Sequence, residues 1–216
     1  MDIAVFGLGY VGAVSAACLA QAGHRVIGVD SNEGKADLIN AGRSPVVEKG
    51  LDEMIGSAVA ERRLRALADH RAAIHDSELA IVCVGTPSRG NGDLDLTHVK
   101  RVCEDIAGAL RDKAGFTAIV IRSTVLPGTL RSMVIPTLES ASGKRAGEDF
   151  GVGFFPEFLR ESTAVADFYD PPKIVIAASD GRTRAMLESL NADSTAMEIT
   201  AAGIEALTVN PTLRPR

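Results

Sequence analysis

The chain opens on Met1-Asp-Ile-Ala-Val-Phe-Gly-Leu-Gly-Tyr-Val-Gly12, and this stretch decides its fold. Ile3 to Phe6 is short and apolar, as a buried parallel strand should be. The glycines of a GxGxxG pattern follow at once, and residues 13–22 then have the composition of a helix. The stretch predicts a strand, a tight turn and a helix, which is the order in which dinucleotide sites begin.

Each glycine of the pattern has a separate expected role. Gly7 allows the tight turn, Gly9 lets a pyrophosphate approach the backbone, and Gly12 lets the helix pack close to the strand. The new helix N-terminus presents unpaired N–H groups and a partial positive charge to the phosphates.

A second strand, Arg25 to Val29, follows the helix and ends in Asp30. Asp30 lies 30 − 7 = 23 residues after Gly7, close to where a carboxylate should meet a ribose hydroxyl. This context favours a site for NAD over one for NADP. The alternative is a glycine-rich turn with an ordinary acidic residue at the end of a strand.

Composition limits the classes of protein to which the chain can belong. The net charge is −5 and the Lys and Arg residues are scattered, so nothing argues for nucleic acid. No apolar stretch approaches the roughly 20 residues that span a bilayer. Because Met1-Asp2 leads straight into the expected strand, we also expect no signal peptide. The three cysteines lack the spacing of a metal site or a disulfide, and we expect buried thiols in a cytoplasmic protein.

Strands and helices alternate along the chain, which predicts an α/β fold with a Rossmann-type, doubly wound parallel sheet. The expected strands Leu79–Val84 and Thr117–Ile121 run into the turns Gly85–Pro87 and Ser123–Pro127. Because ligands bind beyond the carboxyl ends of parallel strands, we expect these turns and the Gly7–Gly12 turn to line one crevice. Alternatively, Gly, Pro, Ser and Thr simply supply the turns that strands need.

Taken together, five motifs resemble the UDP-glucose/GDP-mannose dehydrogenase family. They are Phe6-Gly-Leu-Gly-Tyr-Val-Gly-Ala13, Val84-Gly-Thr-Pro-Ser88, Gly90-Asn-Gly-Asp-Leu-Asp-Leu96, Arg122-Ser-Thr-Val-Leu-Pro-Gly-Thr129 and Pro156-Glu-Phe-Leu-Arg-Glu-Ser-Thr-Ala164. The resemblance covers residues 1 to about 190 and implies a two-step oxidation of a sugar C6 hydroxyl to a carboxylate with two NAD. It is closest to the GDP-mannose branch, which serves alginate-type polysaccharides, and UDP-glucose remains the alternative substrate.

The resemblance also implies roles for individual residues. Tyr10 and Val11 would contact the cofactor diphosphate, Asp30 would bind the adenosine ribose with Lys35 nearby, and Thr86 and Thr124 would border the cofactor. Thr124 would also hold a catalytic water, which Glu157 would organise or deprotonate. Phe158, Leu159, Arg160 and Glu161 match contacts to the sugar nucleotide. Without the resemblance, Lys35, Glu157, Arg160 and Glu161 could equally be solvated charges.

The chain departs from the family pattern in several places. None of its cysteines falls in a family motif, although oxidising an aldehyde to an acid needs a thiol nucleophile. Thr208 and Thr212 stand where the family places a lysine and an asparagine, and Phe155 stands where an asparagine is usual.

We therefore expect an NAD-binding domain in residues 1–199 and an aberrant tail in residues 200–216, at the start of the family's linker helix. Either the chain is a truncated or frameshifted product of a longer gene, or it is a natural module that lost the chemistry. We expect truncation, and we expect the chain alone to be inactive. Family members form homo-oligomers through elements largely beyond residue 216, so the oligomeric state stays open.

Overall fold

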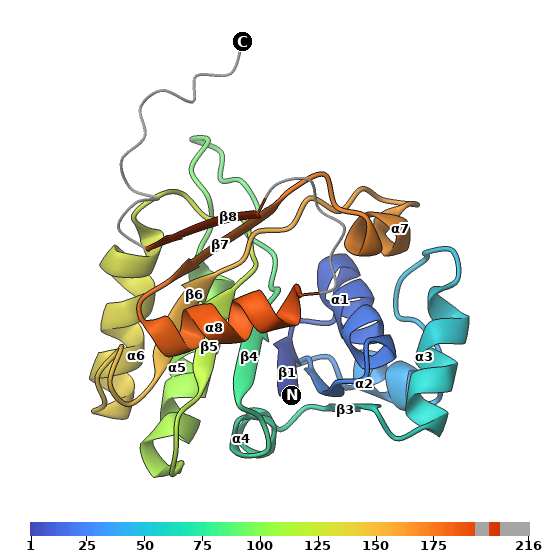
Figure 1. The fold of residues 1–216 in the computed structure, drawn as a ribbon, viewed down its shortest axis with the longest axis horizontal. Helices are drawn as coiled ribbons and strands as arrows, with labels where there is room; N and C mark the ends of the chain where they lie inside the picture. Colours follow the sequence, from blue (N-terminus) through green and yellow to red (C-terminus); the bar gives the residue numbers. More distant parts are fainter. Residues whose placement is uncertain (193–198, 204–216) are drawn as a thin grey trace.

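A computed structural model describes residues 1–192 and 199–203 and arranges them as a central sheet covered by helices (Figure 1). Within this part of the chain the sheet has eight strands, in the order β3-β2-β1-β4-β5-β6-β7-β8. The strands are β1 (Asp2–Phe6), β2 (Arg25–Val29), β3 (Leu64–Leu67), β4 (Leu79–Val82), β5 (Ala118–Ile121), β6 (Gly151–Phe154), β7 (Ile174–Ala178) and β8 (Ile199–Gly203). The order reverses between β1 and β4, where a doubly wound sheet opens a crevice beyond its carboxyl ends.

Strands β1 to β6 run parallel, which confirms the predicted Rossmann-type sheet. β7 is antiparallel to β6, and β8 is parallel to β7, so the sheet is mixed at this edge. If β7 were parallel to β6, the connection between them would have to cross from the carboxyl end of β6 back to the amino-terminal end of the sheet. The connection from β6 to β7, which contains the short helix α7 (Ala164–Tyr169), instead returns to the end of the sheet where β6 ends, and β7 starts there.

Helices cover both faces of the sheet. One face carries α1 (Tyr10–Gln21), α2 (Glu33–Asn40), α3 (Leu51–Ala60), α7 and α8 (Gly181–Leu190). The other carries α4 (His70–His75), α5 (Thr97–Asp112), the π-helical turn Leu130–Val134 and α6 (Ile135–Ser142).

The strands separate two apolar cores by simple alternation. In β1, Ile3 and Val5 pack on the side of α1, whereas Ala4 and Phe6 pack on the side of α5. Strands that are buried on both faces read as continuous apolar runs, and this is why Ile3 to Phe6 could be identified as a parallel strand.

α1 packs unusually close to the turn that precedes it. Residues 12–20 of this helix are all buried, between the sheet and helices α3 and α7. Gly7 has φ +93°, a conformation that favours glycine. A Cβ on Gly12 would lie 1.7 Å from the Gly7 carbonyl oxygen, so only glycine fits there. The predicted roles of these two glycines in the turn and in helix packing agree with this geometry.

The structure contains elements that the sequence pattern did not reveal. These are β3, α4, α7 and β8. The first three are four to six residues long, too short to show a clear period, and β3 carries the exposed Arg65. β8 crosses the expected domain boundary at residue 199, and the tail positions Thr208 and Thr212 lie outside the described residues.

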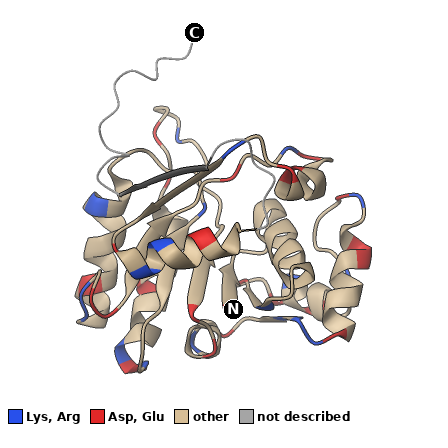
Figure 2. Cartoon of the chain, in the orientation of Figure 1, with Lys and Arg blue, Asp and Glu red and all other residues tan. Residues whose placement is uncertain are grey.

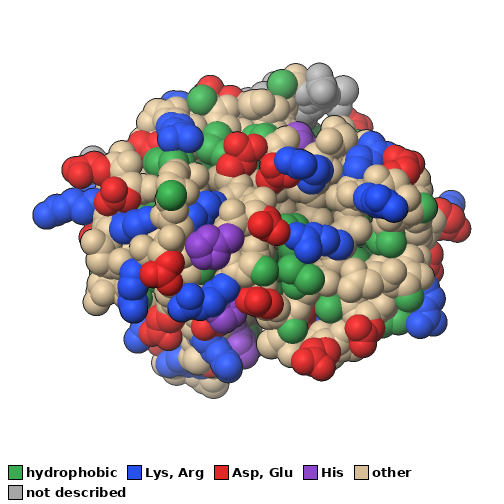
Figure 3. Space-filling view, turned by 90° about the horizontal axis from the view of Figure 1, so that it is seen from below, with side chains coloured by type: hydrophobic (Ala, Val, Ile, Leu, Met, Phe, Trp, Pro, Cys, Tyr) green, Lys and Arg blue, Asp and Glu red, His purple; other side chains and the backbone are tan. Residues whose placement is uncertain are grey.

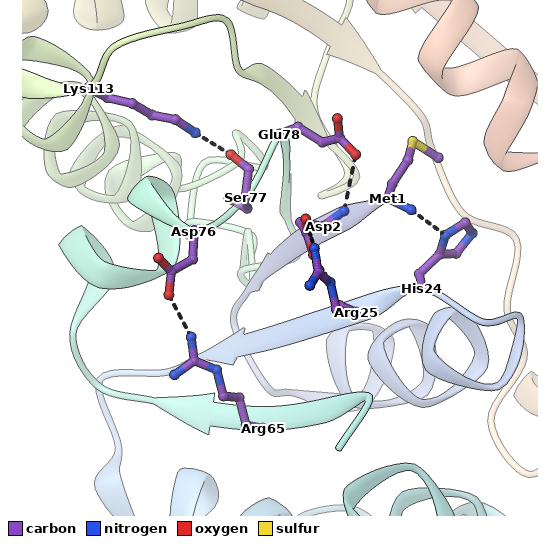
Figure 4. Close-up of polar contacts among 9 residues, drawn as sticks. All are labelled: Met1, Asp2, His24, Arg25, Arg65, Asp76, Ser77, Glu78 and Lys113. Carbon is purple, nitrogen blue, oxygen red and sulfur yellow. Dashed lines mark hydrogen bonds and ion pairs between the residues drawn. The ribbon is translucent and has the colours of Figure 1, made fainter. Parts of the chain in front are cut away.

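Polar contacts tie together the amino-terminal edge of the sheet (Figure 4). Arg25 pairs with Asp2, and Arg65 Nη2 lies 2.7 Å from Asp76 Oδ2. Figure 3 shows the molecule from below, where cationic and anionic side chains are interspersed. Figure 2 shows the same mixture of charges along the ribbon. Exposed pairs of this kind contribute little stability each.

The contact between Gly12 and Gly7 leads to a stability prediction. Gly12→Ala is expected to lower the free energy of unfolding by about 3 kcal/mol or more, because the new methyl group must displace backbone. Gly9→Ala is the matched control, since a Cβ on Gly9 meets no atom within 4 Å, and it should cost about 1 kcal/mol or less. Urea unfolding followed by circular dichroism measures both, and equal losses in the two variants would contradict the proposed packing role.

Candidate functional site

The three predicted turns meet at the carboxyl edge of the sheet. The Thr86 hydroxyl donates to the Thr124 carbonyl at 2.8 Å, and the Ser123 hydroxyl donates to the Val84 carbonyl at 2.6 Å. A Cβ on Gly7 would lie 3.0 Å from the Val84 side chain, which places the glycine turn against the same segment. The prediction that these turns lie together is therefore confirmed, and a ligand site between them stays a prediction.

The start of α1 is arranged to receive an anion. Gly9 is the N-cap residue, and no side chain caps the helix within the part of the chain that the structure describes. The first N–H groups of a helix have no partner inside it, and here they include those of Tyr10 and Val11. No acidic residue lies in the first turn, and the space over Gly9 is open. Backbone donors and the positive end of the helix dipole therefore face a position that a diphosphate could occupy.

Asp30 lies directly after β2, beside the glycine turn. Its carboxylate accepts hydrogen bonds from Leu8 N at 2.7 Å and from Asn32 N at 2.9 Å. Lys35 Nζ lies 3.2 Å from the same carboxylate, and the Asp30 side chain is 11% exposed. Burial raises the pKa of this carboxyl group, but the three donors together outweigh burial and leave the pKa below its ordinary value. Asp30 is therefore an ionised acceptor at neutral pH.

The segment 156–163 follows β6 and contains the residues that the family resemblance predicts to contact the sugar nucleotide. Glu157 accepts a hydrogen bond from Leu159 N at 2.5 Å, and the Leu159 side chain packs against the core. Glu161 is exposed. Lys173 Nζ lies 4.9 Å from the centroid of the partly exposed Phe158 ring. Its position after β6 puts the segment at the same carboxyl edge as the three turns.

Arg160 is engaged within the segment. Its guanidinium holds Asp167 with two nitrogens, at 3.2 Å and 2.7 Å, and its backbone N–H donates to the same carboxylate at 2.9 Å. These hydrogen bonds lower the pKa of Asp167. Arg160 is nevertheless 78% exposed, so the pair leaves much of the guanidinium open to a ligand.

Arg122 is a buried cation that the sequence did not mark as a site residue. It is 5% exposed, and its guanidinium carbon lies 4.3 Å from the centroid of the Phe155 ring. Nη1 donates to the Phe155 carbonyl at 3.4 Å, whereas Nε has no partner among the described residues. Burial lowers the pKa of Arg122, and the nearby Cys83 and Glu157 oppose this shift. The contact also gives a physical role to the unusual Phe155, whose ring covers the cation.

Arg122 and Glu157 line a cavity of about 210 Å³ between α1 and the 155–174 segment. One feature of the sequence could have indicated that Arg122 is buried: it directly follows the apolar strand β5. Apolar sequence around an arginine does not reveal whether the side chain turns inward, and this is why its burial was missed.

The three cysteines of the chain are all buried and unpaired. Cys18, Cys83 and Cys103 are buried free thiols, and burial raises the pKa of each to about 12. Residues 1–192 and 199–203 contain no group of three or more His, Cys, Asp or Glu side chains that could hold a metal ion. Nor does any helix in these ranges have the length and hydropathy needed to cross a membrane.

Comparisons with known proteins agree with this geometry. Residues 1–194 match the NAD binding domain of the UDP-glucose/GDP-mannose dehydrogenase family. A GDP-mannose 6-dehydrogenase of Pseudomonas syringae pv. syringae is 53% identical over 190 residues, which are 88% of this chain and 43% of that protein. A UDP-glucose 6-dehydrogenase of Haloferax volcanii is 38% identical over 84% of this chain and 42% of its own length.

Solved structures show the same relationship. The crystal structure of a ternary complex of GDP-mannose dehydrogenase from Pseudomonas aeruginosa superposes with a TM-score of 0.94 at 48% identity. The match covers 96% of this chain and 48% of that one. The chain thus spans less than half the length of each of these three relatives. It belongs to the UDP-glucose/GDP-mannose dehydrogenase family and corresponds to the NAD-binding domain of that family.

Proposed function

We propose that the carboxyl edge of the sheet binds NAD and serves the oxidation of a nucleotide sugar at C6. The observation that carries this proposal is the uncapped, open start of α1 beside the ionised Asp30. Gly9 lets the diphosphate approach, the N–H groups of Tyr10 and Val11 donate to it, and Gly7 and Gly12 fix the turn. Asp30 accepts hydrogen bonds from the adenosine ribose. Lys35 orients that carboxylate across a 3.2 Å ion pair.

Thr86 and Thr124 border the other half of the cofactor in this proposal. Their direct hydrogen bond at 2.8 Å supports it, because it fixes the two turns at the crevice. Bound NAD supplies a hydride acceptor. Within this chain, Thr124 would position the catalytic water, and Glu157 would organise that water or take its proton.

The segment after β6 would form the sugar-nucleotide side of the site, with Phe158, Leu159, Arg160 and Glu161 in contact with the substrate. The exposure of Arg160 supports this role, since a guanidinium suits phosphate oxygens. The relatives favour GDP-mannose, because the GDP-mannose 6-dehydrogenases are 51–53% identical and the UDP-glucose enzymes 38–40%. The product would be GDP-mannuronate for an alginate-type polysaccharide, formed in the cytoplasm. UDP-glucose is the second candidate substrate.

Measurements of NAD binding and of NADH formation distinguish the proposed function from that of a catalytically silent NAD-binding module. We expect the purified chain to bind NAD in calorimetry and to form negligible NADH with GDP-mannose or UDP-glucose, because none of its buried thiols is in a position to attack a substrate. Joined to a relative's C-terminal half, it should form NADH faster with GDP-mannose than with UDP-glucose. An NAD-binding fusion that oxidises neither sugar nucleotide would favour the silent module.

The role of Asp30 predicts a loss of cofactor affinity. Asp30→Ala should weaken NAD binding by about 1–3 kcal/mol, roughly 5- to 150-fold, because charge-assisted hydrogen bonds to the ribose are lost. Asp37→Ala is the matched control, since this acid lies exposed on α2. Calorimetric titration compares the two variants, and an unchanged affinity in Asp30→Ala would remove this residue from the site.

The pKa of Asp30 predicts a specific pH dependence. Because the folded pKa lies below the ordinary value of 3.8, the interactions of this carboxylate stabilise the fold above that pH. The stabilisation should disappear as the pH falls through the folded pKa. Carbon-detected NMR of the carboxyl group should show a midpoint below 3.8, and Lys35→Met should raise it. A midpoint that is higher in the wild type than in Lys35→Met would contradict this assignment.

A further inference from the structure

The hydroxyl group of Tyr10 joins three segments that are far apart in sequence. Tyr10 is the first residue of α1, and its hydroxyl donates to the Glu48 carboxylate in the segment before α3. The same oxygen accepts a hydrogen bond from Ser162 N at 2.8 Å, across 152 residues of sequence. The turn proposed to hold the cofactor therefore touches, through one side chain, the segment proposed to hold the sugar nucleotide.

Segment 156–163 depends on side chains to satisfy its backbone. It forms no helix or strand, and three of its N–H groups donate to side-chain oxygens. Leu159 N donates to Glu157 at 2.5 Å, and Arg160 N donates to Asp167 at 2.9 Å. The N–H of Ser162 donates to the Tyr10 hydroxyl. A segment held in this way responds to any movement of the side chains that hold it.

Ser162 has the most demanding backbone conformation in this segment. Its φ of +71° lies in the left-handed region, which non-glycine residues adopt only at a cost. The hydrogen bond from its N–H to Tyr10 is formed in this conformation and helps to maintain it. Because the hydrogen bond to Tyr10 holds Ser162 in this left-handed conformation, it also restricts the positions of the neighbouring Arg160 and Glu161.

Glu48 fixes the direction of the Tyr10 hydroxyl. A phenol donates one hydrogen bond and accepts others, and its hydrogen rotates to suit its surroundings. Because the Glu48 carboxylate can only accept, the hydroxyl hydrogen points toward it and an oxygen lone pair is left for Ser162 N. Burial and the Glu48 contact raise the pKa of Tyr10, so the hydroxyl stays protonated at neutral pH.

We infer that Tyr10 is a positioning residue that transmits NAD binding to the substrate segment. The inference rests on the proposed function, because it takes the backbone N–H of Tyr10 to contact the cofactor diphosphate. NAD would fix the first turn of α1, and the side chain of the same residue would then hold Ser162, and with it Arg160 and Glu161, in place. The cofactor would in this way order the segment that holds the sugar nucleotide through a contact on the adenosine-diphosphate side of the site.

The test is amide hydrogen exchange by NMR on the purified chain, with and without saturating NAD. In the wild type, NAD should slow exchange at Ser162 by about three- to tenfold, the range that one strengthened hydrogen bond supplies. Tyr10→Phe should remove this NAD-dependent slowing. Tyr169→Phe is the matched control, because it deletes the hydroxyl of the other tyrosine in the chain, and it should respond as the wild type does.

A second variant tests the contact without altering α1. Ser162→Gly keeps the N–H donor and accepts the left-handed conformation easily, so it should retain the NAD-dependent slowing. Equal slowing at residue 162 in Tyr10→Phe and in the wild type would overturn the inference, as would its absence from a wild type that binds NAD in calorimetry. A wild type that does not bind NAD would overturn the proposed function and the inference with it.

Discussion

The close approach of α1 to the Gly7 turn is the constraint on which the rest of the site depends. A methyl group at residue 12 would lie 1.7 Å from the Gly7 carbonyl oxygen, so helix and turn meet backbone to backbone. This contact starts α1 directly at the carboxyl edge of β1, beside the point where the strand order reverses. The positive end of the helix therefore faces the crevice, and Leu8 N remains free to fix Asp30.

The remainder of the site is held by side chains that bond to backbone across the ends of the strands. Thr86 and Ser123 join the turns after β4 and β5, and Asp167 holds the segment after β6. Arg122 lies beneath that segment as a buried cation, with Phe155 over its face. Such an edge can move locally while the sheet stays rigid, because few of its hydrogen bonds belong to regular secondary structure.

The sequence predicted much of this arrangement, and the reasons are physical. Continuous apolar runs such as Ile3 to Phe6 mark strands that are buried on both faces, and the glycine pattern marks a contact that no other residue permits. The meeting of the turns Gly7–Gly12, Gly85–Pro87 and Ser123–Pro127 followed from the rule that ligands bind beyond parallel strand ends.

Other features depend on three-dimensional packing and could not be predicted. The short elements β3, α4 and α7 show no clear period, and the antiparallel direction of β7 is visible only in its pairing with β6. The burial of Arg122 and the contact between Tyr10 and Ser162 join residues that only the folded chain brings together. Tyr10 was expected to contact the cofactor through its place in the glycine pattern, and nothing in that pattern indicates where its hydroxyl lies.

The central claim is that the open start of α1 and Asp30 form one NAD site at the carboxyl edge of the sheet. A titration of NAD into the isotopically labelled chain, followed by amide chemical shifts, tests it most directly. The account predicts the largest shifts at residues 7–11 and 30–32, with smaller ones at Thr86 and Thr124. Shifts concentrated at the opposite edge, near Arg25 and Arg65, with Gly9 and Asp30 unchanged, would contradict it.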